Sequence, residues 1–250
     1  MAYQSVFRRY ELKYLITHDE KKLITDAMSP YMRLDKYGRT TVRSIYFDND
    51  SHRLIRRSLE KPEYKEKLRI RSYAQADADT PIFVELKKKY QSIVYKRRIA
   101  MTERDAVRWI CDGEPCPEDG QIHREIDYFS KLYSPLHPSA MLTYEREAYA
   151  PYEGSDFRVT FDENILYRGC DLSLCSEVYG ERVLDQDLIM MELKCSGGIP
   201  LYLAKLLSRE RIYKTSFSKY GAAYVKLIFP EIRLSRDSNK KEYILNGSNF

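Results

Sequence analysis

The sequence predicts an α+β protein built on an antiparallel β-barrel, which forms a charged tunnel with helices packed outside. Long strand-like stretches follow one another with helical stretches between them, and no low-complexity linker divides the chain. The strands place charged residues at alternate positions, with leucine or isoleucine between them. In particular, Glu-Leu-Lys occurs at residues 11–13, 85–87 and 192–194.

An open sheet with one solvent-exposed face would show the same alternation of charged and apolar residues. We favour the barrel because the predicted helices have apolar faces to bury. The strand faces opposite the charges carry apolar residues against which these helices could pack: Leu12, Leu68, Ile70, Leu86 and Leu193. An eight-stranded barrel is just wide enough to hold side chains or one small ligand. The charged faces would then line one interior.

In the first half of the chain, alternation predicts a strand at residues 7–16. Thr17 and Glu20 match a capping box, so a helix should follow and end before Pro30. A helix is also expected at residues 49–60. Runs rich in β-branched and aromatic residues predict further strands at residues 39–48, 64–73, 82–90 and 92–100.

In the second half, helical patterns fall at residues 103–111 and 122–133. Strands are predicted at residues 140–150, 157–161 and 188–195, and helices at residues 200–207 and 219–228. Residues 162–187 have the weakest pattern, and short strands are expected there. We predict a single domain over residues 1–233 and a polar C-terminal tail at residues 234–250.

Composition excludes several classes of protein. A net charge of +5 supplies little external field, so no nucleic-acid partner is expected. No apolar run approaches the roughly 18–20 residues of a membrane span, and the first residues lack the apolar core of a signal peptide. Five cysteines at spacings unlike those of zinc motifs, with only four histidines, argue against structural zinc. We expect a cytoplasmic protein, while its protein partners stay unknown.

The cations have a spacing that suits phosphate. Arg69 and Arg71 lie two residues apart on one strand, so their guanidinium groups project together, about 6–7 Å apart. Guanidinium groups bind neighbouring phosphates bidentately. Tyr144 with Arg146 repeats this spacing, as do other pairs: Lys96 with Arg98, and Arg158 with Thr160 and Asp162. Each pair alone could be a solvated strand face. Together they indicate either a polyanion site or cations that the Glu-x-Lys pairs neutralise, and the pattern alone does not decide between these two interpretations.

Carboxylates among these cations suggest a divalent metal. Glu11, Glu85 and Glu192 offer the hard oxygen donors that Mg²⁺ or Mn²⁺ prefers, and pairing with adjacent lysines is the alternative. No glycine-rich phosphate loop occurs, so side chains would have to hold a nucleotide. Phosphoryl transfer fits this inventory because it depends mainly on positioning and charge stabilisation.

The chain resembles the VTC domain, the catalytic module of polyphosphate polymerases in the triphosphate tunnel (CYTH-like) superfamily. The resemblance spans residues 7–221 and implies a tunnel-forming antiparallel barrel. It also implies transfer of the γ-phosphate of ATP to inorganic polyphosphate with a divalent metal, Mn²⁺ or Mg²⁺. The segments that carry it, in the family's order, are FRRYELKYLI, TVRSIYFDN, EKLRIRSY, VELKKK, KRRI, LTYEREAY, FRVTFD, IMMELK and SFSKY.

Site residues follow from this resemblance position by position. Glu192 would bind the metal. The expected substrate-binding residues are Lys13, Lys96, Tyr144 and Lys194. The expected catalytic residues are Arg69, Arg71, Lys87, Arg146, Arg158 and Lys219. The chain departs from the pattern at Ser216, where fungal members carry a second lysine, and Lys214 is a candidate substitute.

Two other tunnel functions stay open at this point. A tunnel triphosphatase, or polyphosphate hydrolase, commonly begins with Glu-x-Glu-x-Lys. Here Arg9 stands in place of the first glutamate, which favours the polymerase. A non-catalytic polyphosphate-binding module is the second alternative, and the retained Glu192 speaks against it.

Overall fold

Strand pairing closes the sheet into a barrel. The computed structural model describes residues 6–233, with side chains from Arg9 onward. Within them, an antiparallel sheet runs in the order β6-β2-β3-β4-β5-β1-β9-β7-β8, and β6 also pairs with β7, so the ring closes. The short β8 lies beside β7. The strands are β1 Val6–Ile16, β2 Met32–Asp48, β3 Tyr64–Ser72, β4 Pro81–Tyr90, β5 Ile93–Thr102, β6 His137–Pro151, β7 Arg158–Arg168, β8 Glu181–Arg182 and β9 Ile189–Cys195.

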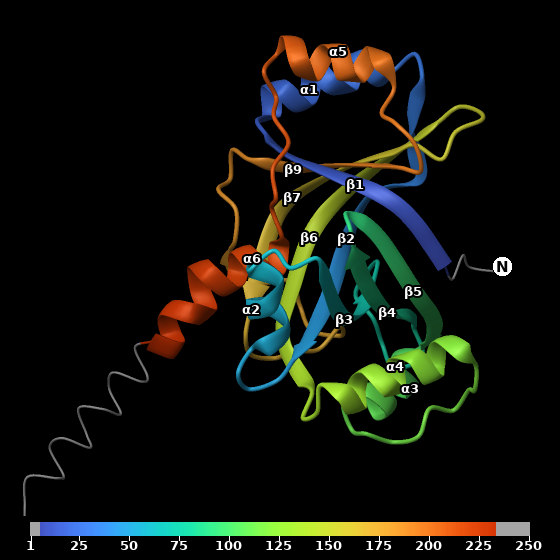
Figure 1. Ribbon diagram of the computed structural model, residues 1–250, viewed down its shortest axis with the longest axis vertical. Helices are drawn as coiled ribbons and strands as arrows, with labels where there is room; N and C mark the ends of the chain where they lie inside the picture. Colours follow the sequence, from blue (N-terminus) through green and yellow to red (C-terminus); the bar gives the residue numbers. More distant parts are fainter. Residues whose placement is uncertain (1–5, 234–250) are drawn as a thin grey trace, which may run out of the picture.

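The helices lie around this barrel (Figure 1). One pair, α1 and α5, packs together on one side, while α3 and α4 lie against β4 and β5 on another. A third pair, α2 and α6, meets at one end of the barrel. The helices are α1 His18–Met28, α2 Arg53–Leu59, α3 Glu103–Ile110, α4 Gln121–Leu132, α5 Leu201–Arg209 and α6 Lys219–Ala223, which continues into a π-helical turn at Tyr224–Ile228. This arrangement confirms the predicted fold class.

The polar tail expected at residues 234–250 lies outside the described residues. Among the helices that the structure describes, none has the length and apolar character needed to cross a membrane.

Local side-chain chemistry sets where the first two helices begin. The Thr17 hydroxyl accepts from the Glu20 amide at 3.2 Å, and the Thr17 amide donates to the Glu20 carboxylate at 2.8 Å, which confirms the capping box. The second helix begins at Arg53, four residues later than expected. The reason is that both Asp48 carboxylate oxygens accept backbone amides of the first helical turn at 2.9 Å.

Two strands are longer than their sequence pattern indicates. β2 begins at Met32, but its register with β6 shifts between Leu34 and Arg39. β7 continues to Arg168 through Asn164, which has a positive φ of 48°. An irregularity of this kind moves the following side chains to the other face of the strand. The alternation therefore breaks there, and a reading of the pattern ends the strand too early.

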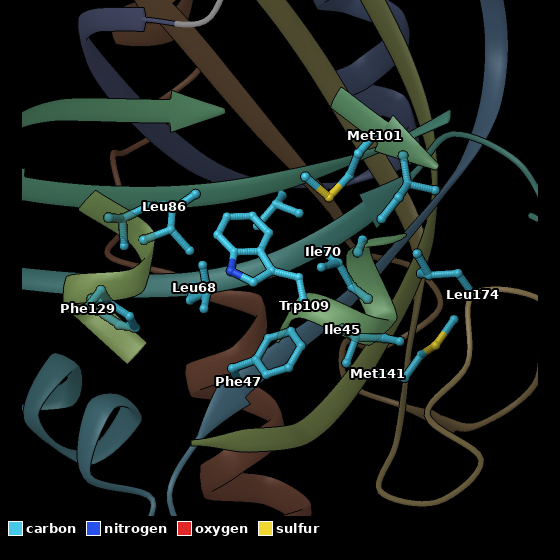
Figure 2. Close-up of a cluster of buried hydrophobic side chains, with 14 of the residues drawn as sticks. Ile45, Phe47, Leu68, Ile70, Leu86, Met101, Trp109, Phe129, Met141 and Leu174 are labelled. Atoms are coloured by element: carbon cyan, nitrogen blue, oxygen red, sulfur yellow. The ribbon is translucent and has the colours of Figure 1, made fainter. Parts of the chain in front are cut away.

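Apolar side chains cover the outside of the barrel. Leu68, Ile70 and Leu86 are fully buried between β3, β4 and the helices α3 and α4. Trp109 of α3 lies among them in Figure 2, and its indole Nε1 donates to Asp127 at 2.7 Å. A second cluster joins α1 and α5 to the outer face of β1, β7 and β9. Burial of the leucine faces outward directs the charged faces inward.

A third apolar cluster fills the α6 end of the barrel interior. It joins Val42 and Tyr46 of β2 and Tyr144 of β6 to Tyr220 of α6. The rings of Tyr46 and Tyr220 stack with centroids 5.0 Å apart. The interior is therefore charged along most of its length and aromatic where α6 enters it.

We expect Leu86→Ala to lower the free energy of unfolding by about 2–5 kcal/mol, because it removes a fully buried side chain from the cluster in Figure 2. Lys88→Ala, two residues along the same strand, should change it by less than about 0.5 kcal/mol. Urea denaturation measures both. Equal effects of the two substitutions would contradict this account of the outer core.

Candidate functional site in the barrel interior

The strand register brings the charged positions onto one surface. Directly paired residues in an antiparallel sheet point to the same side. Lys13 pairs with Glu192 across β1 and β9. Arg69 pairs with Glu85 across β3 and β4, and Lys87 with Lys96 and Thr160 with Glu192 continue the series around the ring. Because the sheet is closed, this common side is the barrel interior.

Glu85 is the centre of the first cluster and is fully buried. Its carboxylate accepts from the Arg69 Nε at 2.8 Å and from the Lys96 Nζ at 2.6 Å. Burial alone would raise the pKa of Glu85, but the charges of Lys96, Arg69 and Arg71 lower it well below its usual range. One carboxylate thus holds cations from β3 and β5.

Hydroxyl groups orient the two arginines of β3. Arg69 donates to the Tyr46 hydroxyl at 2.8 Å, and Arg71 donates to the Tyr144 hydroxyl at 2.9 Å. Arg71 also donates to the Ser44 hydroxyl at 2.9 Å. Burial raises the pKa of Tyr144 to about 12, so its hydroxyl keeps a proton that it can donate to a phosphate oxygen.

Asp162 of β7 is the centre of the second cluster and was not among the predicted site residues. It is fully buried, and Arg146 of β6 forms a bidentate pair with it at 2.6 and 2.7 Å. Lys219, at the start of α6, donates a hydrogen bond to the same carboxylate. Lys219 also lies 4.4 Å from the centroid of the Tyr144 ring. The only sequence signal for Asp162 was its position two residues after Thr160 on a charged strand.

Glu192 collects cations from three strands. Its oxygens lie 3.0 Å from the Lys194 Nζ, 3.6 Å from the Lys13 Nζ and 3.7 Å from an Arg146 guanidinium nitrogen. Burial opposes ionisation, but these cations with Lys219 lower the pKa of Glu192 well below its usual range. Burial also lowers the pKa of Lys194 to about 8, although Glu192 opposes that shift.

Glu192 alone cannot complete the coordination of a metal ion, so further oxygen donors would have to bind the same ion. Among the described residues, no group of three or more His, Cys, Asp or Glu side chains could hold a metal ion. Mg²⁺ is commonly bound by one or two carboxylates and the phosphates of its substrate. The ionised Glu192 fits that arrangement. Glu11 is a second nearby carboxylate, and Lys87, which pairs with it at 2.6 Å, lowers its pKa to about 2 against the effect of burial.

In the part of the chain that the structure describes, three sequence-selected residues make no ion pair with the carboxylates of these clusters. Arg158 starts β7 and pairs with Lys194 of β9, which places it on the interior side, but its guanidinium group donates to the backbone carbonyls of Ser155 and Phe157. Ser216 and Lys214 are exposed on the segment that leads into α6. Lys67, which was not in the predicted set, faces the interior opposite Lys87 and donates to the Ser218 hydroxyl at 3.0 Å.

Two surface hollows lie outside the barrel, with volumes of about 340 and 550 Å³. Both are lined by Tyr31 and Tyr202, whose rings stack at 4.2 Å. Neither is lined by a residue of the charged clusters. The charged clusters therefore lie in the barrel interior and not in these two hollows.

Comparison with known proteins agrees with this arrangement. A family model described as the VTC domain matches residues 8–228. No curated protein matches the chain. A solved structure of a proposed adenylate cyclase from Bacillus halodurans superposes with a TM-score of 0.55 at 14% identity, covering 86% of this chain and 96% of that one. At this identity the likeness shows the fold alone.

Two further solved structures match with lower TM-scores and cover similar shares of both chains. A proposed adenylate cyclase from Vibrio parahaemolyticus has a TM-score of 0.42 at 10% identity, over 88% of this chain and 98% of that one. The Mimivirus capping enzyme triphosphatase has a TM-score of 0.39 at 11% identity, over 82% of this chain and 89% of that one.

Anion binding in the interior should weaken as the pH rises through about 7. Burial, with the nearby Arg69 and Arg71, lowers the pKa of Lys96 to about 7, although Glu85 opposes the shift. Lys96 therefore loses its charge near neutral pH in the empty interior. An anion should raise that pKa, so tripolyphosphate binding should be accompanied by proton uptake above this pH.

Isothermal titration calorimetry in buffers of different ionisation enthalpy measures this uptake. Lys96→Arg keeps its charge at every pH used and should remove that component. The same proton uptake in the arginine variant would contradict the assignment to Lys96.

Proposed function

The chain belongs to the VTC domain family, and we propose that it is a polyphosphate polymerase that transfers the γ-phosphate of ATP to inorganic polyphosphate. The observation that carries this proposal is the convergence of cations on one interior surface. These cations come from five strands and one helix, and they are Arg69, Arg71, Lys87, Lys96, Arg146, Lys194 and Lys219. Two polyanions must meet in this reaction, and these cations offset their mutual repulsion.

The buried carboxylates explain how such a site exists without its substrate. Arg69 and Lys96 both pair with Glu85, and Arg146 and Lys219 both pair with Asp162, so each carboxylate offsets part of the charge of two cations. An incoming phosphate can take over these contacts because guanidinium groups accommodate carboxylate and phosphate in similar bidentate geometry. We infer that polyphosphate binding exchanges internal ion pairs for phosphate contacts.

The transfer itself needs no protein base. A terminal oxygen of the acceptor chain, already ionised at neutral pH, forms the new bond to the γ-phosphorus. The bond from that phosphorus to the bridging β–γ oxygen breaks, and ADP leaves with the electron pair. Arg69, Arg71 and Arg146 would orient the phosphates in line and stabilise the charge that develops on them. Tyr144 would donate its hydroxyl proton as a hydrogen bond to a phosphate oxygen.

Glu192 would hold a divalent metal together with phosphate oxygens of the substrate. When bound, Mn²⁺ or Mg²⁺ supplies charge neutralisation at the transferred phosphate. Lys13 and Lys194 beside Glu192 would contact the same phosphates and exclude water from them.

Arg69→Ala should lower polyphosphate synthesis from ATP by at least about tenfold, because it removes a charge that contacts the transferred phosphate. Arg146→Lys should have a smaller but measurable effect, since it keeps the charge and loses the bidentate fork. Exposed Arg104, which pairs with Asp79, offers the control Arg104→Ala. Gel analysis of the product measures synthesis, and thermal unfolding checks the fold. Wild-type synthesis by folded Arg69→Ala would overturn the assignment of the interior.

Glu192→Gln should abolish turnover that depends on Mn²⁺ or Mg²⁺, because the amide offers a metal a weaker ligand at the same volume. Exposed Glu114→Gln is the matched control. The measurement is turnover against metal concentration. An unchanged titration curve would exclude Glu192 as a ligand. Free phosphate in place of polyphosphate from the wild-type protein would instead identify a hydrolase.

A further inference from the structure

Four lysines face one another where β3 and β4 meet. Lys67 pairs with Lys87 and Lys65 pairs with Lys89, so both pairs point to the interior. Tyr64 and Tyr90 form the next pair, and Gln91 and Ser92 make the turn to β5. The lysines therefore lie at one end of the barrel, where all four are half-buried. Like charges directly opposite in a sheet are destabilising, so this arrangement has a cost in the empty protein.

Three of these lysines differ from the deeper cations in having no carboxylate partner within the described part of the chain. Lys67 donates to the Ser218 hydroxyl at 3.0 Å, and Lys65 donates to the Ser58 carbonyl at 3.0 Å. The ammonium group of Lys89 makes no hydrogen bond or ion pair with residues 9–233. Lys87, by contrast, pairs with Glu11 at 2.6 Å.

The uncompensated lysines are continuous with the proposed catalytic interior. Lys13 is near enough to affect the charge of Lys65, Lys67 and Lys89, and Lys13 contacts Glu192. Burial and the neighbouring lysines lower the pKa of all three. A bound polyanion would relieve this repulsion. Glu11, which pairs with Lys87 and opposes the lowering of the pKa of Lys89, offsets only part of it.

We propose that Lys65, Lys67 and Lys89 form a chain subsite that binds polyphosphate beyond the phosphates held at Arg69, Arg71 and Arg146. The proposal rests on the proposed function and assigns the path of the chain toward the β4–β5 turn. Lysine is a flexible point charge without a fixed bidentate geometry. A lysine subsite therefore suits a chain that must move by one phosphate at each addition, whereas the arginines suit a phosphate held in one position.

The test is calorimetric binding without ATP or divalent metal, so that no turnover occurs. The probes are tripolyphosphate, which fills the arginine site, and a long-chain polyphosphate, which extends past it. For Lys65→Ala/Lys89→Ala we expect about tenfold weaker binding of the long chain and a change below about threefold for tripolyphosphate. Lys88→Ala is the matched control, since Lys88 lies between Lys87 and Lys89 but faces outward to Glu66 at 3.9 Å.

The outcomes separate the two proposals. Selective loss of long-chain affinity supports the lysine subsite. The subsite proposal would be wrong if the folded double variant kept its affinity for the long chain, or if it lost affinity equally for both probes. In either case, binding of both probes by the wild-type protein would remain consistent with the proposed function. If the wild-type protein binds neither probe, the proposed function itself fails, and the subsite fails with it.

Discussion

An ion enclosed in a barrel interior must have a partner, because the loss of water costs several kcal/mol for each charge unless opposite charge and hydrogen bonds replace it. Closure of the sheet imposes this condition on every charged strand face in the chain. Glu85, Asp162 and Glu192 each meet it by pairing with two or more cations from different strands or from α6. These three carboxylates are therefore ionised although they are buried, and their charges hold the neighbouring cations in place.

The same condition relates structure to function. In the function proposed above, a phosphate would take the place of the carboxylate beside an arginine. The guanidinium groups keep their orientation because hydroxyls such as those of Tyr46 and Tyr144 fix them. The lysines beside the β4–β5 turn differ in this respect, because Lys65, Lys67 and Lys89 have no carboxylate partner among the described residues.

Packing outside the barrel keeps this interior in place. The leucines between the charged positions are buried under α1, α3, α4 and α5. A register slip of one residue would turn these leucines into the barrel interior and place the charged side chains under the helices. On the inner side of the barrel, α6 places Tyr220 against Tyr46 and Lys219 beside Asp162, and its N-cap residue Ser218 accepts a hydrogen bond from Lys67. The helix thus serves as both an end wall and a source of one cation.

The sequence by itself determined the alternation on each strand, and with it the charged and apolar faces, the capping box at Thr17 and most helices. It could not show where irregularities extend β2 and β7, because the alternation breaks there. Nor could it show which charges meet. Asp162 pairs with Arg146, 16 residues before it, and with Lys219, 57 residues after it. Arg158 donates to backbone carbonyls of the residues just before β7. Only the tertiary structure decided these contacts, since they depend on how the strands are ordered around the barrel and on where α6 enters it.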